Sequence, residues 1–567
     1  MSRRTVGRSH GSALGALALS ASLGLFLPLV ATAAERPNDV PRRAETLERL
    51  KAKYPDFRFR LDPAESDGAG MDMGEAAPVG AFGAAAALEG TDVRATATAV
   101  GFDQQRLLAG HLLRHATFGP SPSDVTRAVR MGPTRWVDWQ LGLRGNPGCA
   151  GKLPRVNAKN IYNDWERLKR WYARTVCAQD QLNEKMTLIW HELFATSNEK
   201  VGVALLMDKQ EVMLRRYALT NFRNLLLNIT TDQAMMVFLD NDPNSGTLRD
   251  ENGNKILPNR NYAREFQQLF SVGPVLLNMD GTPIVDGSGI PVPTYTEEEV
   301  NDMARALTGW EVDWRKFTKA KFIPGDHDPD PKTILGVPLP GRPLKTASLE
   351  VRDVVDVVMQ HPNLAPFISK YLIQKLATER PSPAYVERVA TVFKERKGDL
   401  RRTVRAILLD PEFSSDANLR AGYKEPIEHF VGAARALSAT TDGAAFIEWT
   451  ALTKQLLYYP PSVFSFYPPG QKRQLVNTAT VTYRDRGADQ LAAAWWSIKW
   501  DANALIKKNK ITTPEMAVDW LSDALLVGPL QPEVRQRIVD YMGGGVNQWK
   551  FRGAVWLIMA SPDFQRQ

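Results

Sequence analysis

P-N-R-N-Y-A-R-E-F-Q-Q-L-F-S-V-G, residues 258 to 273, is the clearest helical pattern in this chain of 567 residues. Its apolar side chains recur every three or four residues, which places them on one side of an α-helix: Tyr262, Phe266, Leu269 and Phe270. The polar side chains form a separate stripe, made of Asn261, Arg264, Glu265 and Gln268. The stretch therefore predicts an amphipathic helix whose apolar face packs on a core.

A second stretch of this kind follows at D-M-A-R-A-L-T-G-W, residues 302 to 310. Met303, Leu307 and Trp310 share the apolar face, and Asp302 and Arg305 lie beside it. The run G-D-H-D-P-D-P-K comes next, at 325 to 332. Carboxylates, guanidinium groups and an imidazole are thus concentrated in one third of the chain, which predicts a site without naming its reaction.

The helical period continues from Phe102 to the end of the chain, for example in Leu182, Met186, Ile189 and Leu193. It is interrupted at 276–295, where D-G between short β-prone runs predicts an inserted β-hairpin. R-A-I-L-L-D-P-E-F at 405–413 and V-W-L-I-M-A-S-P-D-F at 555–564 resemble each other, although Pro commonly stops helices. We expect an all-α fold at 102–567, either one large multi-helical domain or two similar helical subdomains, with a small inserted hairpin.

The first 33 residues have the composition of a signal peptide. Arg3, Arg4 and Arg8 precede an uncharged run from Gly11 to Val30, and A-T-A at 31–33 offers small residues for cleavage. S-R-R-T-V-G-R also resembles a twin-arginine export signal, while general secretion stays open because Gly7 departs from that pattern. We therefore expect a bacterial periplasmic or secreted protein with no transmembrane span in its mature form.

Residues 34–101 change character, because most of this segment is rich in Ala and Gly and has few large apolar side chains. Such a composition cannot offset the entropy of ordering, so the segment is expected to be a flexible linker.

Charge and cysteine content narrow the class of protein further. Lys and Arg number 71 against 63 acidic residues, and they are scattered along the chain, which argues against nucleic acid as a partner. The two cysteines, Cys149 and Cys177, could close a loop of about thirty residues in an oxidising compartment. Two buried thiols are the alternative.

An ordered series of motifs resembles the bacterial exported family known as domain of unknown function 1800. The series includes R-L-L-A-G-H-L-L-R-H-A-T-F-G at 106–119, N-F-R-N-L-L-L-N-I-T-T-D-Q at 221–233, both helices above and P-P-S-V-F-S-F-Y-P-P at 460–469. The resemblance implies an exported, largely helical protein without an agreed activity. This sequence departs from the family pattern at Arg260 and Gln268, where the family has Glu. Of three acids on that helix only Glu265 remains, which weakens a mechanism built on paired carboxylates.

The candidate roles follow from side-chain chemistry. Glu265, His327 and His191 are acid–base candidates, since His191 is expected to face away from the core of its helix. Arg264 and Arg305 could hold an anionic substrate, with Trp310 beside them. Oxygen donors around one imidazole would suit a divalent metal ion, held by Asp326, His327 and Asp328. The alternative for this segment is a rigid turn in which Asp side chains bond to backbone amides.

Aromatic side chains outside the obvious core pattern suggest a sugar ligand: Tyr162, Trp165, Trp171, Tyr172, Phe464, Phe466 and Tyr467. Aromatic faces in a groove suit sugar rings through apolar stacking. Two classes of function then compete. One is a hydrolase or lyase acting on envelope or extracellular polysaccharide. The other is a noncatalytic envelope protein that binds or assembles with a co-exported enzyme. A cleft that brings Glu265, His191 and His327 together would favour the enzyme.

Overall fold

Many helices of this protein begin at a side chain that accepts a hydrogen bond from the first turn. Asp103, Ser121 and Asn163 cap their helices in this way. The computed structural model describes residues 93–99, 101–143, 145 and 148–567, all within one compact unit, residues 73–567. The predicted signal peptide and most of the predicted linker lie outside the described residues. Helices account for nearly all the regular structure in the described part, which confirms the all-α prediction.

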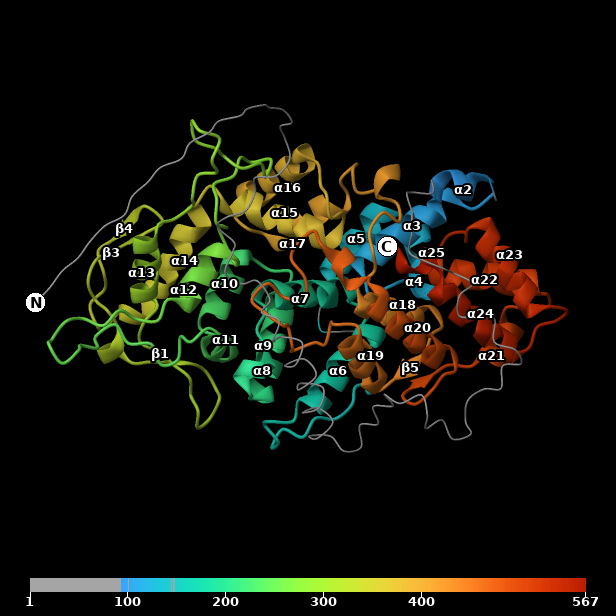
Figure 1. Cartoon of the computed structure of the whole chain (residues 1–567), viewed down its shortest axis with the longest axis horizontal. Coiled ribbons are helices and arrows are strands. Elements are labelled where there is room, and N and C mark those ends of the chain that lie inside the picture. Colours follow the sequence, from blue (N-terminus) through green and yellow to red (C-terminus); the bar gives the residue numbers. More distant parts are fainter. Residues whose placement is uncertain (1–92, 100, 144, 146–147) are drawn as a thin grey trace, which may run out of the picture. The chain divides into compact units, whose positions relative to one another are not determined.

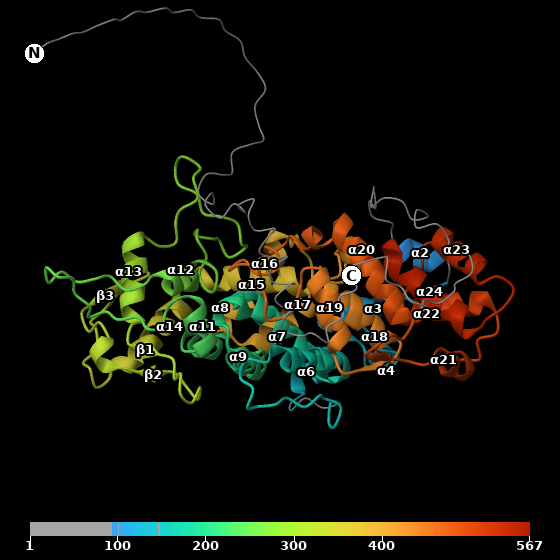
Figure 2. The same ribbon diagram turned by 60° about the horizontal axis from the view of Figure 1, so that its bottom comes forward.

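The helices are labelled in Figure 1, and a second view is given in Figure 2. The first are α2 (Val93–Ala99), α3 (Gln104–Ala116), α4 (Pro122–Met131), α5 (Pro133–Gly142), α6 (Asp164–Cys177), α7 (Gln181–Phe194), α8 (Asn198–Val201) and α9 (Ala204–Tyr217). There follow α10 (Phe222–Thr230), α11 (Gln233–Phe238), α12 (Asn261–Gln268), α13 (Glu297–Ala306), α14 (Glu350–Gln360), α15 (Leu364–Leu376), α16 (Pro383–Glu395) and α17 (Leu400–Leu408). The last are α18 (Pro426–Ala436), α19 (Ala444–Leu452), α20 (Thr478–Ala492), α21 (Ala502–Lys508), α22 (Pro514–Leu526), α23 (Pro532–Met542), α24 (Gln548–Ala560) and α25 (Pro562–Gln565). Short 3₁₀ helices are η1 (Pro324–Asp326), η2 (Ala347–Leu349), η3 (Asp416–Asn418) and η4 (Lys472–Leu475).

The strands of the described residues are short and antiparallel. They pair as β1 (Trp310–Glu311) with β2 (Lys321–Phe322), β3 (Lys332–Ile334) with β4 (Val337–Leu339), and β5 (Thr440–Thr441) with β6 (Ile498–Lys499). The segment predicted as a hairpin folds back on itself through antiparallel bridges, Val275 to Pro293, Leu277 to Pro283 and Val285 to Pro291. This confirms a small hairpin insertion between α12 and α13.

The helix α7 lies in the interior of the helical assembly in both views (Figures 1 and 2). Nearly all of its side chains are buried, including the ionisable Glu184, Lys185, His191 and Glu192. A helix that is covered on every side must place its charges among partners inside the protein, because an unpaired buried charge is costly.

Those partners form a group that we call the buried charge network: Lys185, Glu192, Lys375, Glu425, Glu428, Gln455, Tyr467 and Lys472. Lys185 pairs with Glu428, and Lys375 Nζ lies 2.8 Å from Glu192 Oε2. Gln455 Nε2 donates to Glu192 at 3.0 Å and to Glu425 at 2.6 Å, so the amide joins the two carboxylates. The network ties α7, α15 and α18 together through contacts that depend on each charge having its partner.

Cys149 and Cys177 form a disulfide, with their Cα atoms 5.1 Å apart. This confirms the predicted bond and fixes the loop between α5 and α6 to the end of α6. None of the described helices combines the length and apolar character that crossing a membrane requires.

One part of the predicted linker is ordered. Residues Val93–Ala99 form α2, with Ala97 fully buried against Leu107 and Leu419 and Arg94 paired with Asp416 at 2.6 Å. The small Ala97 side chain allows a close helix contact that composition alone does not reveal.

Candidate functional site

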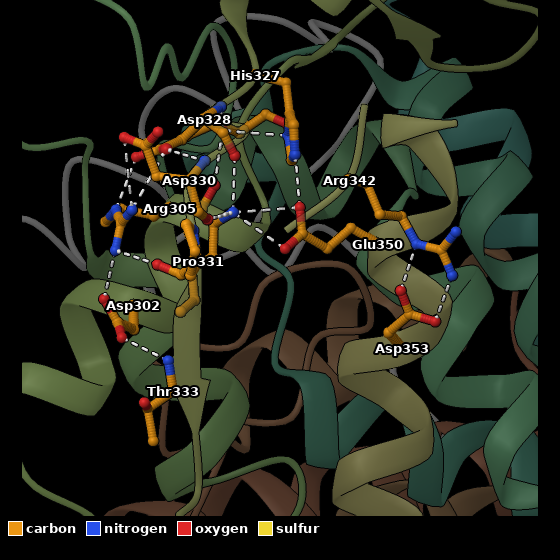
Figure 3. Close-up of polar contacts among 12 residues, drawn as sticks. Asp302, Arg305, His327, Asp328, Asp330, Pro331, Thr333, Arg342, Glu350 and Asp353 are labelled. Carbon is orange, nitrogen blue, oxygen red and sulfur yellow. Dashed lines mark hydrogen bonds and ion pairs between the residues drawn. The ribbon is translucent and has the colours of Figure 1, made fainter. Parts of the chain in front are cut away.

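The run G-D-H-D-P-D-P-K folds into a turn held by ion pairs (Figure 3). The side chain of Asp328 is fully buried and lies 2.6 Å from both Arg305 Nε and Lys255 Nζ. Burial opposes its ionisation, but hydrogen bonds from Arg305 and Lys255 outweigh that effect and lower its pKa to about 2. Arg305 also donates to Asp302 at 2.8 Å, one turn earlier on α13, and Asp302 accepts from the Thr333 N–H at 2.6 Å, which fastens α13 to the end of the turn. The carboxylate is therefore engaged by protein cations.

His327 is buried between the turn and the start of α14. Its Nε2 lies 2.5 Å from Glu350 Oε2, and its Nδ1 lies 3.1 Å from the carbonyl oxygen of Thr308 (Figure 3). Lys332 Nζ donates to the same Glu350 at 3.0 Å. The three side chains are each at most 1% exposed, so the imidazole has no face open to a substrate. In this arrangement His327 bridges two elements of the fold.

The expected metal ligands point to different partners. Asp326 Oδ1 accepts from Ser245 Oγ at 3.1 Å, whereas His327 and Asp328 are engaged as described above. Asp326 ends the 3₁₀ helix η1 and His327 has extended backbone, so different local structures direct the side chains of these two residues. Among the residues that the structure describes, no group of three or more His, Cys, Asp or Glu side chains is placed to hold a metal ion.

Arg264 and Glu265 lie on α12, which packs beside α13. Arg264 makes a bidentate pair with Glu297, at 2.7 Å to each oxygen, near the start of α13. Arg305 is eight residues further along α13, roughly 12 Å at the rise of an α-helix. Arg264, on α12, therefore contacts the first turn of α13, whereas Arg305 lies in the last turn of α13. Only Arg305 lies next to the turn that carries His327.

The carboxylate of Glu265 receives no hydrogen bond from a described residue. Its pKa is raised because burial disfavours the charged form, and the neighbouring Arg264 opposes this shift. We expect Glu265→Gln to leave the free energy of unfolding at neutral pH within about 1 kcal/mol of the wild type, since the partner of Arg264 is Glu297. Chemical denaturation measures this, with Glu297→Gln as the control that does break the pair. A loss of several kcal/mol in the Glu265 variant would show a structural contact that this arrangement does not contain.

His191 faces the interior, which corrects the expectation that it turns away from the core. Its ring packs against Trp171, Tyr458 and Phe466, and its Nε2 accepts from the Tyr458 N–H at 3.3 Å. Burial lowers its pKa to about 3, so the ring is neutral at physiological pH. The apolar pattern of α7 predicted an exposed His191, but the polar side of this helix is covered by other parts of the protein as well. Glu265, His327 and His191 therefore have three separate sets of neighbours.

The aromatic side chains that suggested a sugar ligand divide into two groups. Trp171, Tyr172, Phe466 and Tyr467 belong to the core. Tyr162, Trp165 and Phe464 lie at the surface, where Tyr162 is 58% exposed and the other two are partly buried.

Trp310 lies in the wall of a cleft of about 590 Å³, which we call the Trp310 cleft. Gly309, at a φ of +85°, turns the chain from α13 into β1, and an added Cβ there would lie 3.0 Å from Phe322 and 3.1 Å from His327. The Trp310 ring then contacts Phe322 across the β1–β2 pair, at 5.3 Å between ring centres. The cleft is lined by Leu206, Lys209 and Met213 of α9, Leu227 and Asn228 of α10, Thr231, Asp232 and Gln233 before and in α11, Trp310, Thr318, Lys319, Ala320, and Ser348, Leu349, Val351 and Arg352 around the start of α14.

Asp232 is the single carboxylic acid in this lining. It caps α11, and its Oδ1 accepts from the Met235 N–H at 3.0 Å and from Gln210 Nε2 at 2.7 Å. Burial raises its pKa to about 6, and these hydrogen bonds only partly oppose the shift. A carboxyl group that titrates near pH 6 in a cleft can exchange protons at physiological pH.

The other charged groups of the cleft are the cations Lys209, Lys319 and Arg352. Lys209 donates to the carbonyl oxygen of Phe317, and the side chains of Lys319 and Arg352 are exposed. Three cations and one acid give the cleft a positive charge. An aromatic ring and an excess of positive charge are features that suit an anionic sugar chain.

Sequence reasoning named Trp310 and missed the rest of this cleft. T-T-D-Q at 230–233 can be recognised as a helix start, with Asp as the cap. Its position in a cleft depends on the distant segment around the start of α14, which no local pattern links to it.

A second cleft of about 590 Å³ lies beside the disulfide. Asp124, Arg127, Lys152 and Arg435 contribute charges to its lining, and Asp124 is paired with Arg435 at 2.7 Å. None of its lining residues is aromatic, so it offers no surface for a sugar ring.

One of the three comparisons with known proteins found a match. The family model described as "Protein of unknown function (DUF1800)" matches residues 111–566. No curated protein and no solved structure matches the chain.

Proposed function

We propose a function from the Trp310 cleft, because this chain belongs to the DUF1800 family and the description of that family names no activity. The proposed function is binding of an acidic polysaccharide outside the cytoplasm. The observation that carries the proposal is one cleft that combines an aromatic ring, three cations and one carboxyl group with a raised pKa. The cations would hold the carboxylates of the sugar chain, and Trp310 would contact a ring face. The composition of the signal region and the disulfide support an exported protein.

Between the two reaction types, the cleft suits a lyase better than a hydrolase. Glycoside hydrolysis commonly uses a pair of carboxyl groups, and this lining contains only Asp232. In a β-elimination on a uronate chain, Asp232 as carboxylate would take the C5 proton, the C4–C5 double bond would form, and the C4–O bond would break. The departing oxygen would then receive a proton from the same carboxyl group. Arg352 and Lys319 would stabilise the negative charge that develops on the uronate during proton removal.

The noncatalytic alternative also has a specific observation in its favour. His327 and His191, the histidines expected to act as acid–base groups, are engaged inside the protein, and Asp232 stands alone in the cleft. A binding or assembly partner for a co-exported enzyme would need the cations and Trp310 but not the carboxyl group. The two alternatives therefore differ in what they require of Asp232.

The pH dependence of the wild type, compared with that of Asp232→Asn, distinguishes the lyase from the noncatalytic binding protein. With a pKa of about 6, Asp232 is charged above that pH and neutral below it, whereas uronate carboxylates stay ionised down to about pH 4. Binding of polygalacturonate or alginate should therefore tighten by up to about tenfold as pH falls from about 7.5 to 5. A lyase rate would change in the opposite direction, because its base becomes protonated. Titration calorimetry measures the first, and absorbance of the unsaturated product measures the second.

In the Asn variant binding should be tight at both pH values, and any lyase activity should fall by a factor on the order of 10² to 10⁴. Asp180→Asn is a matched control, since burial also raises the pKa of Asp180 to about 6 but the residue is outside the cleft lining. Wild-type binding that weakens with falling pH, or no binding of any acidic polysaccharide, would rule out the proposal.

A further inference from the structure

Three tryptophans gather at the surface between α6 and the turn that follows α20. Trp165 and Trp496 are stacked, with ring centres 6.5 Å apart and planes inclined by 25°. Trp495 packs against Trp496 at 5.7 Å. Trp495 and Trp496 remain 43% and 40% exposed, although apolar burial would favour covering both. We call this group the tryptophan platform.

The turn that presents the platform is firmly held. The Trp495 N–H donates to the Gln490 carbonyl at 3.0 Å, and the Ile498 N–H donates to the Trp495 carbonyl at 3.1 Å. Ser497 Oγ accepts from the Ala445 N–H at 2.9 Å, which attaches the turn to α19. These bonds fix the backbone on both sides of Trp496, so the exposed rings occupy defined positions.

The backbone of this turn is also strained. Trp496 has a φ of +53°, in the left-handed region that bulky side chains rarely adopt, and Ala494 has a φ of +54°. Such a conformation is energetically unfavourable and persists where the surrounding contacts impose it. A large ring placed at the surface by a strained and well-anchored turn is the arrangement expected of a binding group.

The platform is connected to the Trp310 cleft through α9. The Leu205 N–H, in the first turn of α9, bonds to the Ile161 carbonyl at 2.9 Å, next to the exposed Tyr162, and Arg167 of α6 lies 4.0 Å from Asp208 of α9. Leu206 and Lys209 of the same helix line the cleft. Both views show α6 beside α9 (Figures 1 and 2). One helix, α9, therefore contributes to the cleft and contacts α6, which carries Trp165.

We infer that the tryptophan platform is a second binding subsite, which stacks the pyranose rings of the polysaccharide that the Trp310 cleft holds by its charges. This inference rests on the proposed function for its ligand class. An indole face offers apolar area to the CH groups of a sugar ring and carries no charge, so the platform would contribute to binding of acidic and neutral chains alike.

The size of the platform argues against a protein partner. Three half-exposed indoles offer a few hundred Å² at most, since a whole aromatic side chain accounts for about 150–250 Å². A stable interface needs about 800 Å² on each partner. Tyr162 is 58% exposed and follows Ile161, whose carbonyl oxygen accepts from the first turn of α9.

The test replaces Trp496 with Asn, because Asn tolerates a positive φ and should relieve the strain without disturbing the turn. We expect an unchanged or higher melting temperature, together with affinity lowered on the order of tenfold for both alginate and neutral laminarin. Trp495→Ala should act in the same direction. Trp549→Ala is the matched control, since Trp549 is 50% exposed but lies on α24.

A cleft variant, Arg352→Ala, distinguishes the two proposals, because it should weaken binding of alginate and leave binding of laminarin unchanged. If Trp496→Asn binds both polysaccharides like the wild type, the platform inference is wrong, whatever Arg352→Ala does. If only the Trp variants lose binding, the platform stands and the cleft proposal fails. Light scattering of the wild type that shows a dimer, lost in Trp496→Asn, would overturn the platform as a sugar subsite and make it an interface between copies.

Discussion

Replacing Glu428 with Gln should lower the free energy of unfolding by at least about 3 kcal/mol at neutral pH. Its partner Lys185 is 1% exposed, so the ammonium would stay inside the protein without its carboxylate. The same carboxylate is a close negative charge to Lys424, Lys472 and Arg484, which are also buried. Removing one negative charge therefore leaves several cations facing one another in a medium of low dielectric constant.

Chemical denaturation followed by circular dichroism measures this cost. A second substitution, Lys185→Met in the Glu428→Gln background, serves as the control, because it removes the stranded ammonium and keeps its volume. The double variant should recover a large part of the lost stability. If the single variant loses less than about 1 kcal/mol, the network must admit enough water to hydrate Lys185, contrary to the burial observed here.

The parts of the fold that could be predicted from sequence each leave a local pattern. Apolar residues at helical spacing predicted the helices, D-G between β-prone runs predicted the insertion at 276–295, and the cysteine pair predicted the disulfide. These patterns depend on residues that are near one another in the chain. These elements can therefore be predicted without knowledge of tertiary contacts.

The candidate site could be predicted only in part, for a physical reason. A pattern argument assumes that charged side chains face water, yet Lys185, His191 and Glu192 lie inside because α7 is covered on every side. The concentration of charged residues at 325–332 predicted a site, and the structure shows buried ion pairs there. The Trp310 cleft depends on side chains from α9, α11, β1 and the start of α14, and only Trp310 among them was selected from the sequence.

The turn at 325–332, which we call the charged turn, and the Trp310 cleft are nevertheless connected. Glu350 is the first residue of α14, and the next two residues, Val351 and Arg352, line the cleft. On the other side, His327 crowds Gly309, the residue that sets the start of β1 and hence Trp310. The imidazole and the carboxylate thus hold two walls of the cleft relative to each other, which makes both positioning residues for the proposed ligand.

Glu350→Gln should accordingly cost on the order of 3 kcal/mol of stability and also weaken polysaccharide binding. Lys332 has 0% side-chain exposure and pairs with Glu350 at 3.0 Å, so the variant leaves its charge buried, and His327 loses its carboxylate partner as well. Denaturation and titration calorimetry measure the two effects. Lys332→Met in the same background is the control and should restore part of both.

Substitution of His327 by Gln then decides between positioning and catalysis. A positioning role requires stability, binding and any reaction to fall together, because all three depend on the same bridge between the turn and α14. A catalytic role requires the reaction to fall by orders of magnitude while unfolding and binding stay as in the wild type. The second result would show that His327 reaches a substrate despite 1% exposure, and it would return the active centre to the charged turn.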